Sequence, residues 1–355
     1  MHRCDLTQAG TRVVMSRRQL RPLIQISKTI LRIQLILASM FVAVSIGVAC
    51  NIPVFRYALE RWKPDATEVL IFHDAPLSQS HKQTLQQLQA RTVQHDGDAN
   101  AKVIQIDIAS DLNADNRDVW LSLSEQDGVS LPHVLVRTKS GQGRWINHWH
   151  GPLEDLPQLG LYDSPARAEL GRRLMAGHSV VWLLIGSTND AKTASAKTLV
   201  QSNFESLSER VKLPEGIGLP GSELYADVPL VVKFSLLEID PDDPEEQFLV
   251  SLLTGVRQQA FEDGEPLLVP VFGRGRALEV IPASDMTEKL MEELTVFLSG
   301  ACSCQVKERN PGFDLLINAD WDTELFGDDA NRPPDRSAEE GRNREPELLQ
   351  IPPGR

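Results

Sequence analysis

An uncharged segment near the start of the chain constrains the fold more than any other feature. Residues 33–55 read IQLILASMFVAVSIGVACNIPVF and contain no Asp, Glu, Lys or Arg. Residues 1–32 contain seven Lys or Arg side chains and one acidic side chain. A helix needs about 20 apolar residues to cross a bilayer core, and a basic flank stays on the cytoplasmic side. The pattern predicts a basic cytoplasmic region over residues 1–32 and a signal or membrane anchor over residues 33–55.

The end of this segment leaves three fates open. Its most apolar part, residues 35–49, has the length of the apolar region of a signal peptide. Gly47 and Ala49 are small residues at the positions that an export peptidase requires before Cys50. Residues 47–50, Gly-Val-Ala-Cys, also resemble a bacterial lipobox, in which the cysteine is lipidated. A large aliphatic residue usually stands where this chain has Gly47. An uncleaved anchor, lipidation of Cys50 and simple cleavage are the three alternatives.

Charge and cysteine content exclude two classes of protein. The chain of 355 residues has a net charge of −13. Because residues 1–49 carry +6, the remainder carries −19, and so acidic a surface repels phosphate backbones and argues against nucleic-acid binding. Only two of the four cysteines, Cys302 and Cys304, follow the membrane segment. The body is therefore no disulfide-stapled scaffold, and its core must come from apolar burial.

Residues 66–176 alternate between strand and helix patterns. Leu131-Pro132 precedes the third expected strand, a turn at residues 140–143 forms a hairpin, and Ser164-Pro165 starts the last helix. The expected strands cover residues 68–73, 102–108, 133–137 and 144–149, and the expected helices cover residues 81–93, 117–124 and 166–176.

Residues 178–300 repeat that order. Glu265-Pro266 precedes the third expected strand, and Gly273-Arg274-Gly275 forms the hairpin turn. Ser284 caps the last helix, which Gly300 follows. The expected strands cover residues 180–185, 230–239, 267–272 and 277–281, and the expected helices cover residues 191–211, 244–256 and 284–299.

Both halves thus have the order β-α-β-α-β-β-α with a proline at the start of the third strand, which resembles the thioredoxin fold. The resemblance implies an α/β protein of two tandem thioredoxin-like domains. We expect an amphipathic linker over residues 56–65, the first domain over 66–176 and the second over 177–319, including a Cys-x-Cys extension. From residue 320 the chain loses its hydrophobic periodicity and is rich in charged residues and proline. Residues 320–355 are therefore expected to form a disordered acidic tail.

The chain departs from redox-active members of that family at one decisive place. Those members carry Cys-x-x-Cys between the first strand and the first helix, where the helix N-terminus lowers a thiol pKa. Here the corresponding residues are His73-Asp74-Ala75-Pro76-Leu77-Ser78 and Gly186-Ser187-Thr188-Asn189-Asp190. Neither stretch contains a cysteine, so dithiol chemistry is not expected at the usual site in either half.

Histidines fall where the resemblance would bring strand ends together. His73 ends the first strand, His133 starts the third, and His148 and His150 lie in the fourth. Alternation along a strand predicts that His148 and His150 share one face. Imidazole groups are good ligands for zinc and similar metals. The arrangement predicts either a histidine-lined metal or ligand site, or histidines that occupy strand ends without such a role.

Cys302-Ser303-Cys304 offers a second candidate site. Outside the cytoplasm two such close thiols could form a strained, exchangeable disulfide, or they could bind a soft metal. The alternative is that both are small, partly buried residues of a turn.

These observations favour a membrane-tethered protein on the extracytoplasmic side of a bacterial inner membrane, in the periplasm. Thioredoxin-like domains without a dithiol generally serve in binding, so we expect a non-catalytic binding or scaffold protein. The alternative is a thiol-disulfide or metal-handling protein that uses Cys302, Cys304 and the histidines. We expect no cofactor and no nucleic-acid partner. The expected partners are the membrane, through the N-terminal segment, and another protein of the cell envelope.

Overall fold

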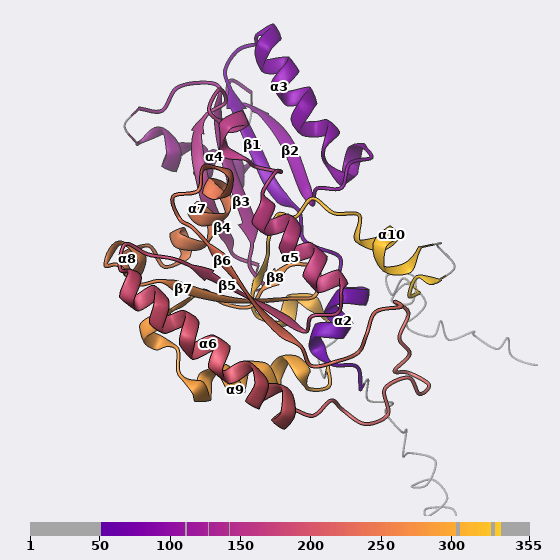
Figure 1. The fold of residues 1–355 in the computed structure, drawn as a ribbon. Helices are drawn as coiled ribbons and strands as arrows, with labels where there is room; N and C mark the ends of the chain where they lie inside the picture. Colours follow the sequence, from indigo (N-terminus) through magenta and orange to yellow (C-terminus); the bar gives the residue numbers. More distant parts are fainter. Residues whose placement is uncertain are drawn as a thin grey trace, which may run out of the picture. The chain divides into compact units, whose positions relative to one another are not determined.

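The computed structural model describes residues 51–110, 112–126, 128–141, 143–302, 306–327 and 331–334. After a first helix, α2 (Val54–Arg61), the first half of the chain alternates between strands and helices (Figure 1). Its elements are β1 (Thr67–His73), α3 (Gln79–Ala90), β2 (Ala101–Asp107), α4 (Ala114–Ser124), β3 (His133–Lys139), β4 (Trp145–Pro152) and α5 (Pro165–Met175).

The second half has a similar order with additional short elements. They are β5 (Val180–Ile185), α6 (Asp190–Arg210), β6 (Phe234–Ile239), α7 (Gln247–Val256), α8 (Gln258–Glu262), β7 (Leu267–Phe272), β8 (Arg276–Ala277), β9 (Ile281–Pro282), α9 (Glu288–Ser299), β10 (Phe313–Asp314) and α10 (Trp321–Phe326). Single turns of 3₁₀-helix lie at Val93–His95, Leu156–Leu159, Pro244–Glu246, Ala283–Asp285 and Lys307–Arg309.

The strands form two mixed sheets. The first has the order β2-β1-β3-β4, in which β1 and β2 are parallel and the β1–β3 and β3–β4 pairs are antiparallel. The second has the order β10-β8-β7-β5-β6, in which β5 and β6 are parallel and the β5–β7 and β7–β8 pairs are antiparallel. The expectation of an α/β protein is therefore confirmed, and so is the hairpin turn between β7 and β8.

One expected strand is interrupted. Residues 277–281 do not form a continuous partner for β7, because β8 ends at Ala277 and β9 begins only at Ile281. Val271 pairs with Ala277 and Leu268 pairs with Ile281. Between these two pairs, the chain opposite β7 is one residue longer than β7 itself. Pro270 lies in the gap and has no amide hydrogen to donate to the ladder. The interruption follows from that missing donor.

The two halves share one hydrophobic core. Helix α5 from the first half packs against β5 and β6 of the second sheet, and α7 from the second half packs against β4 of the first sheet. The shared core contains Val69 and Val136 from the first sheet and Val181 and Val269 from the second, all fully buried. The boundary expected near residue 176 therefore falls inside one compact unit of the described residues.

Strand alternation directs side chains of each sheet into different cores. In β1, Val69 and Ile71 enter the shared core, whereas Leu70 and Phe72 enter a smaller core under α4. Phe72 packs against Trp120 there, with ring centroids 5.3 Å apart. In β5, Trp182 and other residues enter a further core covered by α6, α9 and α2.

The outer end of the expected membrane segment belongs to the folded body. Ile52 is fully buried and Val54 and Phe55 are nearly so, in the core covered by α2, α6 and α9. The prediction that residues 33–55 form one membrane segment is therefore wrong for its last residues, and the expected linker at residues 56–65 is largely the buried helix α2. Residues 33–50 lie outside the described residues. No helix within the described part is long and apolar enough to cross a bilayer.

The expected tail begins later than predicted. Trp321, Leu325 and Phe326 of α10 are about 95% buried and pack into the shared core. Asp320 caps this helix by accepting a hydrogen bond from the amide of Thr323 at 3.1 Å. A helix of only six residues carries too weak a periodic pattern to be recognised from the sequence, which is why this segment was placed in the tail.

Replacing Leu325 with alanine tests whether α10 is part of the core. We expect the free energy of unfolding to fall by about 2–3 kcal/mol, because the change removes buried methyl groups and leaves a cavity. Urea unfolding followed by tryptophan fluorescence measures it. The neighbouring exposed residue provides the matched control, and Glu324→Ala should leave the midpoint nearly unchanged. Equal behaviour of the two variants would mean that α10 does not pack as described.

Candidate functional site

The two strand–helix junctions at which the resemblance to thioredoxin would place a dithiol contain helix caps. At the first junction, Ser78 Oγ accepts a hydrogen bond from the amide of His81 at 3.1 Å and caps α3. At the second, Asn189 Oδ1 accepts from the amide of Lys192 at 3.1 Å and caps α6. Ser187 Oγ donates to the carbonyl of Gly264 at 2.9 Å. These side chains complete helix ends and loops and provide no thiol chemistry.

The structure brings together two of the four candidate histidines. His133 Nε2 and His150 Nδ1 are 3.2 Å apart, and their ring centroids are 5.4 Å apart. His73 lies at the end of β1, where its Nδ1 is 3.1 Å from the carbonyl oxygen of Ala75. His148 contacts neither and instead lies against Thr138 and the ring of Phe313.

A bulge in β4 separates His148 from His150. Val136 pairs with Trp149 and Arg137 pairs with Asn147, so His148 is an extra residue that the pairing register of β3 and β4 skips. An extra residue shifts the alternation of side chains by one position. The expectation that His148 and His150 share a face is therefore wrong.

The paired histidines do not amount to a metal centre. Burial, followed by the neighbouring His150, lowers the pKa of His133, which keeps its ring neutral near pH 7. Across the part of the chain that the structure describes, no three His, Cys, Asp or Glu side chains are grouped so that they could hold a metal ion. The four-histidine site predicted from the sequence is thus reduced to one close pair.

The histidine under α7 makes stability depend on pH. Burial lowers the pKa of His148 from 6.5 to about 4. As the pH falls below 6.5, the unfolded chain takes up a proton that the folded chain does not bind, so stability is lost between pH 6.5 and pH 4. Between pH 7 and pH 5 we expect this histidine alone to cost about 2 kcal/mol. Urea unfolding at the two pH values should show that His148→Gln removes this loss. The variant His95→Gln, at an exposed position, should retain it.

The thiol candidate is only partly described. Cys302 is 2% exposed and lies in the core that α2 and α9 share. Its amide donates to the carbonyl of Ile52 at 2.9 Å, which joins the segment after α9 to the segment before α2. Cys304 and Cys50 lie outside the described residues. What the structure places at Cys302 is a buried side chain next to the start of the described chain.

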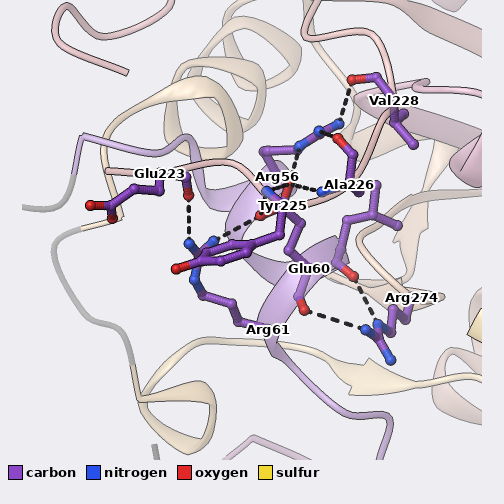
Figure 2. A network of polar contacts seen from close by, with 9 residues as sticks. Arg56, Glu60, Arg61, Glu223, Tyr225, Ala226, Val228 and Arg274 are labelled. Carbon is purple, nitrogen blue, oxygen red and sulfur yellow. Dashed lines mark hydrogen bonds and ion pairs between the residues drawn. The ribbon is translucent and has the colours of Figure 1, made fainter. Parts of the chain in front are cut away.

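A cluster of buried polar side chains lies on α2, and the sequence patterns did not reveal it (Figure 2). Arg56 and Glu60 are both 1% exposed. Arg56 Nε donates to Glu60 Oε1 at 2.8 Å, and the two other nitrogens of the guanidinium donate to the carbonyls of Ala226 and Val228 at 2.6 and 2.9 Å. A buried ion pair of this kind needs hydrogen bonds for every remaining donor and acceptor. Here the loop before β6 supplies them.

The glutamate of this pair gathers donors from three directions. Glu60 Oε2 accepts from Arg61 Nη1 at 3.0 Å. The backbone amides of Tyr225 and Ala226 also donate to the Glu60 carboxylate, at 3.1–3.2 Å. Arg61 continues the network by donating to the carbonyl of Glu223 at 2.6 Å and by lying over the ring of Tyr225 (Figure 2). This helix thereby fixes a loop that is more than 160 residues away in the sequence.

The β7–β8 turn reaches the same helix from the other side. Arg274 Nε donates to the carbonyl of Leu59 at 2.8 Å, and Figure 2 shows Arg274 at the end of α2. Arg274 Nη1 donates to Asp322 Oδ1 at 2.6 Å. Gly273 and Gly275 both have positive φ angles, and a side chain at Gly273 would meet Ala58. The turn therefore approaches α2 closely and links it to the start of α10.

A second buried cluster lies next to this turn. Asp314 Oδ1 accepts from Arg276 Nη1 at 3.0 Å, and Asp314 Oδ2 accepts from Lys307 Nζ and from the amide of Asp65. Arg276 also donates to backbone carbonyls of residues 310–312 at 3.0–3.1 Å. The two clusters border a cleft of about 10 Å³, room for about one water molecule. The cleft is lined by Ala58, Trp62, Pro64, Arg274, Arg276, Lys307 and Asp314.

Each basic side chain of these clusters already meets a carboxylate or carbonyl oxygen, so the clusters join segments of the chain and do not present an open binding site.

One signal in the sequence could have indicated the first of these clusters. Arg56 and Glu60 stand four residues apart next to the apolar stripe of α2, the spacing of an ion pair on a helix. The partners at residues 223–228, 274 and 276 carry no such local signal.

Comparisons with known proteins add no identification. No model of a protein family matches the chain, and no curated protein matches it at a significant level.

Proposed function

We propose that this chain is a membrane-tethered, extracytoplasmic binding or scaffold protein, built on two thioredoxin-like units that lack the redox dithiol. The two strand orders support the fold part of this proposal. The orders β2-β1-β3-β4 and β6-β5-β7-β8 have the same sequence of parallel and antiparallel pairs. The apolar segment before residue 51 and its basic flank support the membrane tether.

The chemistry of the two strand–helix junctions carries the non-catalytic part of the proposal. Ser78 and Asn189 cap helices where redox-active relatives of the fold would place reactive thiols. Cys302 is nearly fully buried, so disulfide exchange at this sulfur would require the surrounding core to open. A protein with these features is better suited to hold a partner than to turn over a substrate.

The open edge of the first sheet is the surface that we assign to binding. Strand β2 ends the sheet and pairs with β1 alone among the described strands. Lys102, Gln105 and Asp107 on this strand are exposed, while Val103 and Ile104 are only half-buried. An edge strand can accept a further strand from a partner through its backbone groups. Charged side chains at an edge also discourage unselective pairing with other chains.

A comparison of cysteine variants tests the proposal against a thiol- or metal-handling function. The full chain is compared with Cys302→Ala/Cys304→Ala and, as the matched control, with Cys4→Ala/Cys50→Ala. The measurements are reduction of glutathione disulfide in the presence of dithiothreitol and the content of bound zinc or copper. We expect all three proteins to show the same background rate and no bound metal. A rate or a metal content that only the Cys302/Cys304 variant loses would overturn the proposal in favour of the alternative.

A further inference from the structure

The described chain is held in the fold from its first residues. The amide of Asn51 donates to Ser222 Oγ at 2.9 Å, and the amide of Val54 donates to the carbonyl of Gly300 at 3.0 Å. Between them, Ile52 is fully buried and Pro53 forms a β-bridge with Ala301. No stretch of chain after residue 50 is left to act as a spacer.

The absence of a spacer has a geometric consequence for the proposed tether. Residues 33–50 are uncharged and directly precede Asn51. One residue of extended chain spans at most about 3.3–3.6 Å. If residues 33–50 insert into a bilayer, the surface around Asn51 must therefore lie at the lipid headgroups.

Exposed apolar side chains are concentrated around this same point. Seven large apolar side chains are exposed among the described residues. Three of them belong to segments that bind residues 51–54, and a fourth, Val306, lies four residues after Cys302, whose amide binds Ile52. Those four are Leu219, Val296, Phe297 and Val306, with exposed fractions of 61%, 53%, 40% and 42%. Single exposed apolar residues are ordinary on a soluble surface. Four exposed apolar side chains close to the point where an apolar segment ends need a common explanation.

Hydrogen bonds connect the segments that carry Leu219, Val296 and Phe297 to the start of the described chain. Leu219 belongs to the turn that ends at Ser222, whose amide donates to the carbonyl of Leu219 at 2.8 Å. Val296 and Phe297 form the last turn of α9, and Gly300 after it accepts from Val54. In Figure 1, α2 lies beside the end of α9, in agreement with the packing between them.

We propose that this apolar surface, formed by Leu219, Val296, Phe297 and Val306, rests in the headgroup region of the bilayer beside the inserted segment. The inference depends on the proposed tether and adds an orientation to it. The free energy of apolar side chains falls when they leave water for this region. Neutral lipids suit the acidic body, which carries −19 after residue 49, better than anionic lipids do. The open edge of β2 would then remain available to a partner in solution.

Spin labels in the full chain test this orientation. The protein keeps its four cysteines and carries a nitroxide on a clickable non-natural amino acid at position 296. A second protein carries the same label at position 121. Leu121 is the matched control, because its exposed fraction of 53% equals that of Val296. Both are reconstituted in phosphatidylcholine vesicles, and flotation first establishes whether the chain is tethered. The collision rates of each label with oxygen and with a water-soluble nickel chelate are then compared.

We expect the oxygen-to-nickel ratio to be at least about threefold higher at position 296 than at position 121, because oxygen concentrates in lipid and the chelate does not. Labels at positions 219 and 306 should behave like the label at 296. If the protein floats but both positions give equal ratios, the orientation is wrong and the tether stands. If the protein does not float, the tether itself is wrong. Shielding of position 296 from both reagents would mean that protein covers it, and would also overturn the inference.

Discussion

Replacing Glu60 with alanine is expected to lower the free energy of unfolding by about 3–5 kcal/mol. The change leaves the guanidinium of Arg56, which is 1% exposed, without its counter-charge. It also leaves the amides of Tyr225 and Ala226 without their acceptor. Water cannot replace the lost carboxylate at a buried site, so the full cost of the unpaired groups appears in the stability. Urea unfolding followed by fluorescence measures the loss, and circular dichroism shows whether the variant is folded.

An exposed pair of the same spacing gives the control for this experiment. Lys289 and Glu293 are also four residues apart on a helix, and their side chains are 85% and 61% exposed. Glu293→Ala should leave the unfolding midpoint nearly unchanged, since exposed pairs contribute little. In addition, the double variant Arg56→Met/Glu60→Met should lose less than the two single variants together, because it removes both charges at once. Additive losses would show that the pair is not coupled as described.

The second large effect is expected at Asp314. The substitution Asp314→Asn keeps the size of the side chain but turns one acceptor oxygen into a donor. Arg276 and Lys307, 2% and 9% exposed, would lose their buried counter-charge. The new NH₂ group would also face a hydrogen-bond donor, from which it cannot accept a bond. We expect a loss of about 3 kcal/mol in the free energy of unfolding. Unfolding curves at low and high salt measure it, and the loss should change little with salt because the cluster is screened from solvent.

The same substitution at a more exposed position separates burial from charge. Asp322 is 31% exposed and pairs with Arg274 at 2.6 Å. Solvent can compensate part of what Asp322→Asn removes, so its effect should stay below about 1 kcal/mol and shrink further in salt. Similar losses for Asp314→Asn and Asp322→Asn would contradict the assignment of Asp314 to a buried cluster.

Local patterns account for most of the element order. Short apolar runs marked the strands that become β1, β3, β5 and β7, and the caps at Ser164 and Gly300 marked helix ends near their observed positions. These signals act over a few residues, through backbone geometry and side-chain alternation. They were sufficient for the α/β class.

The candidate site shows where local patterns fail. Alternation placed His148 and His150 on one face, but a single extra residue in β4 reversed the direction of His148. A bulge depends on how two strands meet, and His148 takes its position from contacts with Thr138 and Phe313. The buried pair Arg56–Glu60 was missed for a similar reason, since its other partners lie about 170 residues away.

The sequence by itself determined the class of fold, most of the order of strands and helices, the lack of a dithiol at both strand–helix junctions and the uncharged segment before residue 51. These are properties of composition and of short-range periodicity. Only the tertiary structure decided that α5 and α7 each pack on the sheet of the other half, that residues 52–62 enter the core and that α10 does so too. Each of these depends on which apolar surfaces meet at long range, and an apolar stripe indicates that a segment is buried but not which distant segment buries it.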